Sequence, residues 1–150
     1  MDLTIRNFES KDWNVVKIIY EQGLFSRNAT FETEAPDYDA WIKKFHPHLL
    51  WVAVINKEEV VGWAGLQPIS VRKVYGGVVE VTIYIDANHC GKGIGSTLMK
   101  HLIDKSEEAG IWTLSASIFP ENVPSIKLHL SAGFREIGYR EKIQPKLSGK

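Results

Sequence analysis

Hydrophobic positions recur along this 150-residue chain with two different periods, and the period indicates the type of element. Alternation of apolar and polar residues predicts strands over residues 4–8, 50–55, 60–66, 78–85, 111–118 and 134–143. Apolar residues three and four positions apart predict helices that end at or near Gly23, Phe45, Gly110 and Gly133. The resulting order, β-α-α-β-β-β-α-β-α-β, predicts an α/β or α+β fold, a mixed sheet with helices packed on it.

The strand over residues 78–85 has the most regular alternation. Aliphatic side chains occupy every second position from Val79 to Ile85 and share one face, while Glu80 and Tyr84 lie on the other face. A carboxylate in so apolar a strand is either solvated at an edge or cleft, or a group that reacts there. The residues alone leave both interpretations of Glu80 open.

A glycine-rich turn, Gly91–Ser96, separates this strand from the following helix. Glycines let a backbone approach a ligand closely, and free amides at the start of a helix attract anions. The turn lacks the Gly-Lys-Ser/Thr ending of a P-loop, and Ser96 stands where the dinucleotide-binding pattern needs its third glycine. Two interpretations remain: a pyrophosphate-binding turn of the coenzyme A type, or a simple connection between strand and helix.

Composition and charge limit the class of protein. Lysine plus arginine and aspartate plus glutamate both number 18, which argues against a nucleic-acid partner, because phosphates need a basic excess. No apolar run is long enough for a membrane span, no leader is visible, and Cys90 is the only cysteine. These features predict one cytoplasmic domain over residues 1–150 without a membrane partner. His46 and His48 lack further ligands at a metal-binding spacing, so no metal is expected.

Two motifs resemble those of the GNAT-type N-acetyltransferases. Residues 79–99 resemble the family's central motif, Gln/Arg-x-x-Gly-x-Gly/Ala, with Gly93 and Gly95 in the glycine positions. Cys90 stands where the family usually has Gln or Arg, which leaves the pyrophosphate contact to backbone amides and a neighbouring lysine. Residues 121–134 resemble a later motif, in which an asparagine opens a helix that runs into Gly-Phe.

Shorter segments narrow the resemblance to one branch, the phosphinothricin (methionine sulfoximine) acetyltransferases. These segments are residues 29–34, the pair Val79-Glu80 with Tyr84, and residues 125–129, within a resemblance that covers about residues 3–143. The resemblance implies a largely antiparallel sheet with helices on both faces. It also implies acetyl-CoA as co-substrate and direct transfer of its acetyl group to the amine of a small amino-acid-like acceptor. Phosphinothricin and methionine sulfoximine represent the acceptor class that it implies.

The resemblance also implies roles for individual side chains. Glu80 takes the position of the branch's catalytic glutamate and is the predicted general base, acting directly or through a water. His129 takes the position of the group that protonates the leaving thiolate, and the pKa of a histidine suits that task near neutral pH. Tyr84 shares the strand face of Glu80 and is predicted to line the same cleft. Structural alternatives stay open for all three: solvation for Glu80, the helix surface for His129 and core packing for Tyr84.

Binding residues follow from the same resemblance. The residues expected to contact the coenzyme are Ile83, Tyr84, Ile85, Gly91, Lys92, Gly93, Ile94, Gly95, Ser96 and Asn122. Phe31 and Glu32 are expected to line the acceptor pocket. Independently of the resemblance, Arg72 and Lys73 lie in the loop before Glu80 and are candidates for binding the acceptor's carboxylate, because a guanidinium suits a bidentate contact; a solvated loop is an at least equal alternative.

The C-terminal end departs from the branch. Residues 144–150 are polar and predict a frayed tail, so the sheet is expected to lack its usual last strand. Either that edge is open or a partner covers it, which leaves a homodimer as one expectation. Among enzymes, the alternative is an acetyltransferase for a polyamine, an aminoglycoside or a protein N-terminus. Outside enzymes, the alternative is a coenzyme-binding regulatory module without catalysis.

Overall fold

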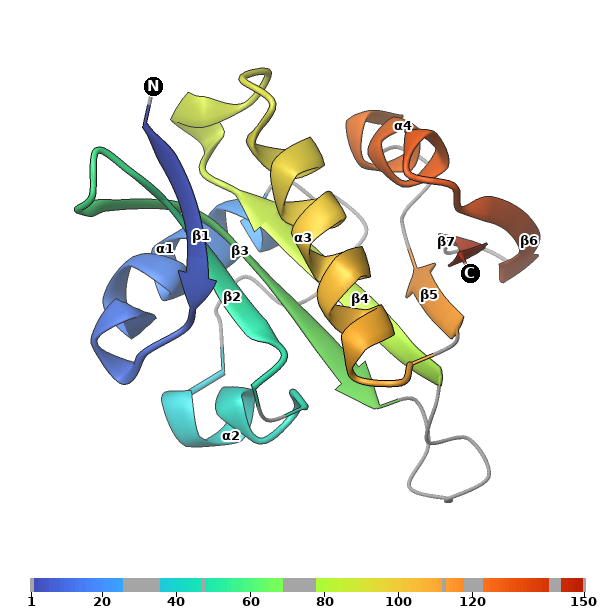
Figure 1. The fold of residues 1–150 in the computed structure, drawn as a ribbon, viewed down its shortest axis with the longest axis horizontal. Helices are drawn as coiled ribbons and strands as arrows, with labels where there is room; N and C mark the ends of the chain where they lie inside the picture. The colour runs from blue at the N-terminus through green and yellow to red at the C-terminus, as the bar shows by residue number, and fades with distance from the viewer. Residues whose placement is uncertain are drawn as a thin grey trace.

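One sheet of seven strands forms the centre of the protein in the computed structural model. The structure describes residues 2–25, 36–46, 48–68, 78–111, 113–117, 123–140 and 144–149. The strands are β1 (Leu3–Asn7), β2 (Leu50–Ile55), β3 (Glu59–Pro68), β4 (Val78–Ile85), β5 (Thr113–Ser117), β6 (Arg135–Arg140) and β7 (Gln144–Gly149). Their order across the sheet is β1-β2-β3-β4-β5-β7-β6 (Figure 1). Neighbours are antiparallel except β4 and β5, which run parallel, so the predicted mixed and largely antiparallel sheet is confirmed.

Helices pack on both faces of the sheet, as predicted. One face carries α1 (Trp13–Phe25) and α2 (Tyr38–Ile42), and the other carries α3 (Ile94–Glu108) and α4 (Val123–Ser131) (Figure 1). Two short 3-10 helices, η1 (Ser10–Asp12) and η3 (Ala87–His89), precede α1 and α3. Within the described residues, none of these helices combines the length and the apolar composition needed to cross a membrane.

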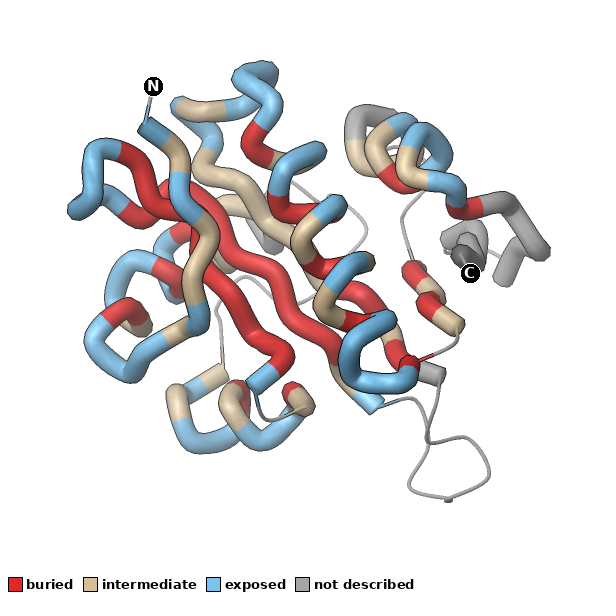
Figure 2. Tube along the Cα trace, in the orientation of Figure 1, coloured by how far each residue is buried: buried red, intermediate tan, exposed pale blue. Residues whose placement is uncertain are grey.

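Two hydrophobic cores lie on opposite faces because strand side chains alternate. From β2, Trp51, Ala53 and Ile55 pack on the α3 side, whereas Leu50, Val52 and Val54 pack on the side of α1 and α2. The α3 side is mostly aliphatic; the other side, here called the aromatic core, includes Phe8, Trp13, Tyr20, Tyr38, Trp41, Phe45, Trp63 and Tyr84. Figure 2 shows β2 and all but the ends of β3 buried, and the outward helix surfaces exposed.

The alternation predicted for β4 is confirmed by this division. Val79 and Val81 belong to the α3-side core, with Ile83 and Ile85 packed against it. Tyr84 packs against the aromatic core. Tyr84 therefore faces α1 and α2, and the alternation places Glu80 on the same side, while the aliphatic side chains of the strand anchor it to α3.

The prediction of a frayed C-terminal tail and a missing last strand is wrong. Residues Gln144–Gly149 form β7, which pairs antiparallel with both β5 and β6 and lies between them. Ser148, for example, faces Ser115 of β5 and Arg135 of β6. A strand is held by main-chain hydrogen bonds to its neighbours, and two available edges suffice even where the side chains lack an apolar alternation.

Candidate active site

The parallel strands β4 and β5 stay together over only part of their length. Val78, Val79 and Glu80 pair with Thr113, Leu114 and Ser115. Beyond Glu80, β4 continues to Ile85 without a described β5 partner, although its other edge remains paired with β3 as far as Gly62. In Figure 1, β5 accordingly lies beside one end of β4. Within the described residues, β4 therefore has an open edge over residues 81–85.

A cleft of about 410 Å³ adjoins this open edge. Residues from β4, from the glycine-rich turn, from α1 and from α4 line it together: Gly23, Ile83, Tyr84, Ile85, His89, Cys90, Gly91, Gly93, Ile94, Gly95, Ser96, Ser125 and Leu128. Most of the residues predicted to contact the coenzyme are thus brought to one place. Lys92 is exposed and does not line the cleft, and Asn122 lies outside the described residues.

The glycine-rich turn needs its glycines for two reasons. Gly91 and Gly93 have φ of +81° and +82°, a left-handed conformation in which an L side chain is strained. Apart from the glycine itself and its two chain neighbours, no atom of the described residues lies within 4 Å of a Cβ built at either position, so the space over the turn is open. At Gly95, by contrast, a Cβ would crowd Leu128, which shows how closely α3 and α4 approach.

The start of α3 presents main-chain donors to this open space. The first helical hydrogen bond runs from the amide of Thr97 to the carbonyl of Gly93, at 3.1 Å. The amides of Ile94, Gly95 and Ser96 precede it, and amides of a first turn have no partner within their own helix. Together with the helix dipole, they make this end of the cleft suited to an anionic group.

Glu80 lies where the two strands part. It is half-buried, sits opposite Gln67 of β3 and Ser115 of β5, and does not itself line the cleft. Tyr84 lies four residues farther along the same strand face, about 13 Å away at the usual rise of a strand. Glu80 and the glycine-rich turn therefore lie towards opposite ends of the open edge.

Tyr84 is held between the cleft and the aromatic core. Its ring stacks on Trp63 with a centroid distance of 5.4 Å and contacts Tyr20 at 5.2 Å. A Cβ at Gly23 of α1 would overlap the Tyr84 ring. The sequence pattern places the end of the first helix at Gly23, but α1 continues to Phe25. The absence of a side chain at Gly23 instead leaves room on α1 for the Tyr84 ring.

His129 is almost fully buried, with 2% of its surface exposed. Its Nδ1 lies 2.7 Å from the carbonyl oxygen of Ser125, and its ring contacts Phe134 edge to face. Burial lowers the pKa of His129, against a smaller opposing contribution from the bond to Ser125. The imidazole is therefore neutral at pH 7, with Nδ1–H donating to Ser125. Ser125 lines the cleft, whereas His129 does not.

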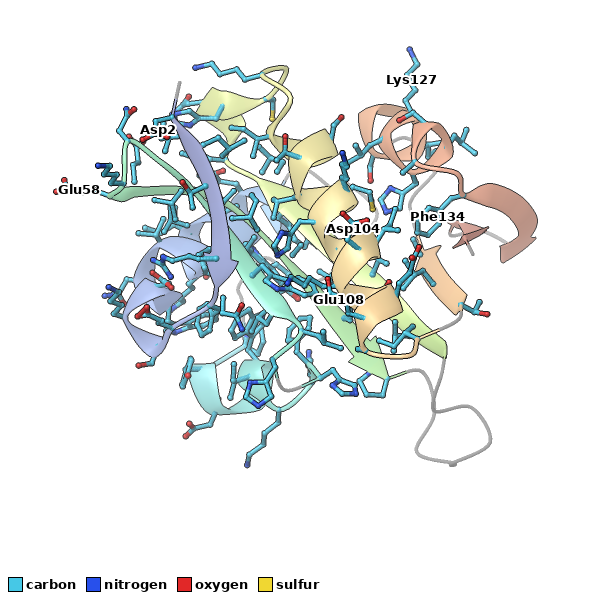
Figure 3. The ribbon with its side chains drawn as sticks, viewed as in Figure 1. Asp2, Glu58, Asp104, Glu108, Lys127 and Phe134 are labelled. Atoms are coloured by element: carbon cyan, nitrogen blue, oxygen red, sulfur yellow. The ribbon has the colours of Figure 1, made fainter. Side chains whose placement is uncertain are left out.

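Side chains in and just after α4 differ in whether they point to solvent, to the cleft or to the core. In Figure 3, Lys127 points away from the molecule, whereas Phe134 after the helix points inward and is buried. His129 and Phe134 thus anchor α4 to the α3-side core, and Ser125 and Leu128 form the part of the helix that faces the cleft.

Several predicted site residues are not placed. Phe31, Glu32, Arg72 and Lys73 lie outside the described residues, so their predicted contacts with an acceptor stay predictions. In the described part of the chain, no group of three or more His, Cys, Asp or Glu side chains is arranged to hold a metal ion.

Sequence reasoning did not assign the cleft positions of Gly23, His89, Cys90, Ser125 and Leu128. Ser125 and Leu128 fall within the later motif, so their helix could have been expected beside the cleft. Gly23 carries no such signal, because its role depends on a tyrosine 61 residues farther along the chain.

Comparison with known proteins gives a consistent result. The sequence matches the Acetyltransferase (GNAT) family over residues 13–134. It is 34% identical to YwnH of Bacillus subtilis, provisionally named a phosphinothricin acetyltransferase, over 91% of this chain and 86% of that protein. It is 30% identical to an L-methionine sulfoximine/L-methionine sulfone acetyltransferase of Salmonella typhimurium, over 88% of this chain and 80% of that protein. The structure of yncA from Salmonella typhimurium, solved with its cofactor acetyl-CoA, superposes on this structure with a TM-score of 0.79. The two sequences are 25% identical, and the match covers 99% of this chain and 91% of that chain.

Proposed function

The chain belongs to the GNAT acetyltransferase family and is an N-acetyltransferase, and we propose that it transfers the acetyl group of acetyl-CoA directly to the amine of a small amino-acid-like acceptor. The proposed acceptors are of the phosphinothricin and methionine sulfoximine class, which the names of the two curated relatives support. A relative solved with acetyl-CoA supports the proposed donor.

The observation that carries the proposal is the open edge of β4, with Glu80 at one end and the glycine-rich turn at the other. The amides at the start of α3 would hold the pyrophosphate of the coenzyme. The edge over residues 81–85 would hold its pantetheine arm through main-chain groups. The thioester would then lie towards Glu80, and the open space over Gly91 and Gly93 fits this arrangement.

The proposed reaction needs a deprotonated amine. Even the α-amino group of a peptide chain terminus has a pKa of about 8, so at neutral pH most of such a group is protonated and cannot attack. Glu80 accepts a proton from the acceptor, directly or through a water, and the free nitrogen then attacks the thioester carbonyl carbon. A main-chain amide of the open edge is the simplest donor to the resulting oxyanion. Collapse of this intermediate breaks the C–S bond and forms the amide.

The departing thiolate takes up a proton, and the source of that proton is a separate question. His129 is the donor that the family resemblance implies, yet its lowered pKa leaves it neutral at pH 7, and a neutral imidazole is a weak acid. The acceptor supplies a second source, because its nitrogen loses two protons over the reaction and coenzyme A takes up only one.

One experiment tests the proposal: release of free coenzyme A is measured with acetyl-CoA and a panel of amines. The panel contains phosphinothricin, methionine sulfoximine, other amino acids, a polyamine, an aminoglycoside and a peptide N-terminus. We expect the first two acceptors to give the highest kcat/KM. A preference for one of the last three would replace the acceptor class. Binding of coenzyme A without turnover on any amine would replace the enzyme with a regulatory module.

The role of Glu80 is tested in the same assay with Glu80→Gln. We expect kcat to fall by about 10² to 10⁴, the usual contribution of a positioned base. Glu58→Gln is the matched control, since Glu58 is an exposed side chain of the turn between β2 and β3 that points away from the molecule (Figure 3). Equal activity of the two variants would remove Glu80 as the base and leave the family assignment intact.

A homodimer and a cytoplasmic location belong to the same proposal as expectations from the family resemblance and the composition. Sedimentation of the purified chain tests the first expectation, and fractionation of the producing cells tests the second.

A further inference from the structure

A hydrogen-bond network joins α1 to the segment between β4 and the glycine-rich turn. The side-chain amide of Gln22 uses both of its ends: Nε2 donates to Oδ1 of Asp86, and Oε1 accepts from the main-chain amide of Ala87, both at 2.9 Å. These residues are more than 60 positions apart in sequence. Gln22 therefore links α1 to this segment by tertiary hydrogen bonds.

Asp86 is the centre of this network. Its second carboxylate oxygen, Oδ2, accepts from Nδ1 of His89 at 2.6 Å. Its main-chain amide donates to the carbonyl of Val61 on β3 at 2.8 Å, and its own carbonyl accepts from the amide of His89 at 2.9 Å. Both the side chain and the main chain of Asp86 are thus fixed, and Asp86 immediately follows the last residue of β4.

The same partners stabilise the ionised form of the Asp86 carboxyl group. Burial alone would raise the pKa of this carboxyl group. Hydrogen bonds from Gln22, from His89 and from the main chain of Asn88, together with electrostatic attraction to His89, outweigh that effect and lower the pKa. An ionised carboxylate so close to an anion-binding turn would repel a pyrophosphate if its oxygens faced the cleft. Here Gln22 and His89 occupy one oxygen each, and Asp86 does not line the cleft.

The network lies directly behind the wall of the cleft. Gly23, His89 and Cys90 line the cleft, and they adjoin or belong to the network. Gly91, the first glycine of the turn in the left-handed conformation, is two positions after His89. A displacement of Asp86 would therefore shift the glycine-rich turn relative to the open edge of β4.

We propose that Gln22, Asp86 and His89 are positioning residues that set the place of the glycine-rich turn and thereby the affinity for the anionic part of the coenzyme. None of the three takes part in the transfer itself. This inference rests on the proposed coenzyme site, and it adds to that site a contribution from α1, on the opposite face of the sheet from α3.

The test compares Gln22→Met, which keeps the length of the side chain and removes its hydrogen bonds, with the matched control Asn14→Met at an exposed position of α1. The dissociation constant for coenzyme A is measured by calorimetry. We expect an increase of about tenfold for Gln22→Met and less than about twofold for the control; a tenfold change corresponds to about 1.4 kcal/mol. If the wild-type chain binds coenzyme A and Gln22→Met binds it equally well, the inference is wrong while the proposed function stands. If the wild-type chain does not bind coenzyme A, the proposed function fails.

A second readout separates positioning from a general loss of structure. The ratio of kcat/KM with acetyl-CoA to kcat/KM with S-acetylpantetheine, which lacks the phosphates, cancels damage common to both donors. We expect this ratio to fall about tenfold in Gln22→Met, with the KM for the acceptor unchanged. An unchanged ratio together with losses for both donors would overturn the inference in favour of a purely structural role.

A pair of substitutions provides the rescue. Gln22→Glu alone places two carboxylates side by side, and we expect it to weaken coenzyme A binding at least as much as Gln22→Met. With Asp86→Asn added, the introduced asparagine can donate its amide N–H to the introduced glutamate while its oxygen still accepts from His89, so the network is restored with donor and acceptor exchanged. We expect the double variant to bind within about threefold of wild type. A folded double variant that still binds coenzyme A weakly would contradict the inference. If Gln22→Glu alone does not fold, the affinity of Gln22→Met for coenzyme A tests the inference instead.

Discussion

The two edges of β4 differ although they belong to the same eight residues. One edge pairs with β3 from Val79 through Ile85, whereas the other pairs with β5 only from Val78 to Glu80 in the described residues. Main-chain N–H and C=O groups that lack a strand partner must bind something else, either water or a ligand. The closed edge thus fixes the strand in the sheet, and the open edge provides the main-chain groups that a coenzyme arm can use.

Glycines on the two sides of β4 show the same difference. Gly62, opposite Ile85 on the closed side, is required by space: a Cβ there would come within 3.0 Å of Ile85 and 3.1 Å of the Tyr84 carbonyl. Gly93, at the far end of the open edge, has open space around it and is required by its φ of +82°. One glycine permits close packing, and the other permits a turn with exposed amides.

The largest effect is expected from a change at the start of the open edge. Glu80→Asp keeps the carboxylate but withdraws it by one methylene group, and a displacement of about 1 Å can cost about 10² in rate. We expect kcat to fall by about that factor with little change in the dissociation constant for coenzyme A. Unchanged steady-state kinetics of Glu80→Asp would show that the carboxylate need not be positioned, and would weaken the contrast between the two edges.

A change on the closed edge should affect stability and leave binding alone. Gly62→Ala crowds Ile85 and Leu98, and overpacking of this kind typically costs about 1–3 kcal/mol. Urea unfolding measures the loss of stability, and calorimetry under native conditions measures the affinity for coenzyme A. A variant that is as stable as wild type but binds the coenzyme weakly would reverse the roles given to the two edges.

Gly93→Ala should weaken coenzyme A binding with little loss of stability, whereas Gly62→Ala should lose stability and keep its affinity. An alanine in the left-handed conformation costs about 1–2 kcal/mol, and the turn can relieve this strain by moving. We expect about a tenfold weaker affinity for coenzyme A and a loss of unfolding free energy of about 1 kcal/mol or less. Coenzyme A affinity equal to that of wild type would mean that the turn does not contribute to binding.

The sequence predicted much of this arrangement because several features are local. Strict alternation placed Glu80 and Tyr84 on one face of β4, and two glycines before a helix indicated an anion-binding turn. What the sequence did not reveal depends on distant partners. The strand Gln144–Gly149 forms because β5 and β6 provide edges, Gly23 is needed because Tyr84 packs against it, and Gln22 reaches Asp86 only once α1 lies on the sheet.

His129 allows a finer test, because it anchors the helix that closes the outer side of the cleft. Its folded-state pKa lies below the unfolded value of about 6.5, so the unfolded chain binds a proton first as the pH falls. This contribution to stability is complete above pH 6.5 and decreases as the pH falls towards the folded-state pKa. In His129→Asn we expect the free energy of unfolding to change less between about pH 7 and pH 5 than in wild type.

The comparison with wild type isolates His129 from other groups. His101 also has a pKa lowered mainly by burial, and its contribution has the same sign, but it is present in both proteins and cancels in the difference. Parallel pH dependences of unfolding in the two proteins would contradict the burial of a neutral imidazole at position 129.

If the open edge of β4 and the adjoining turn form the coenzyme site, bound coenzyme A must protect their main-chain amides from solvent. Amide hydrogen exchange, followed by mass spectrometry with and without coenzyme A, measures this protection. We predict slower exchange in peptides that cover residues 81–96 and no change in peptides of β3, whose amides are already paired on both sides. Binding of coenzyme A that leaves residues 81–96 unprotected and slows exchange elsewhere would contradict the claim.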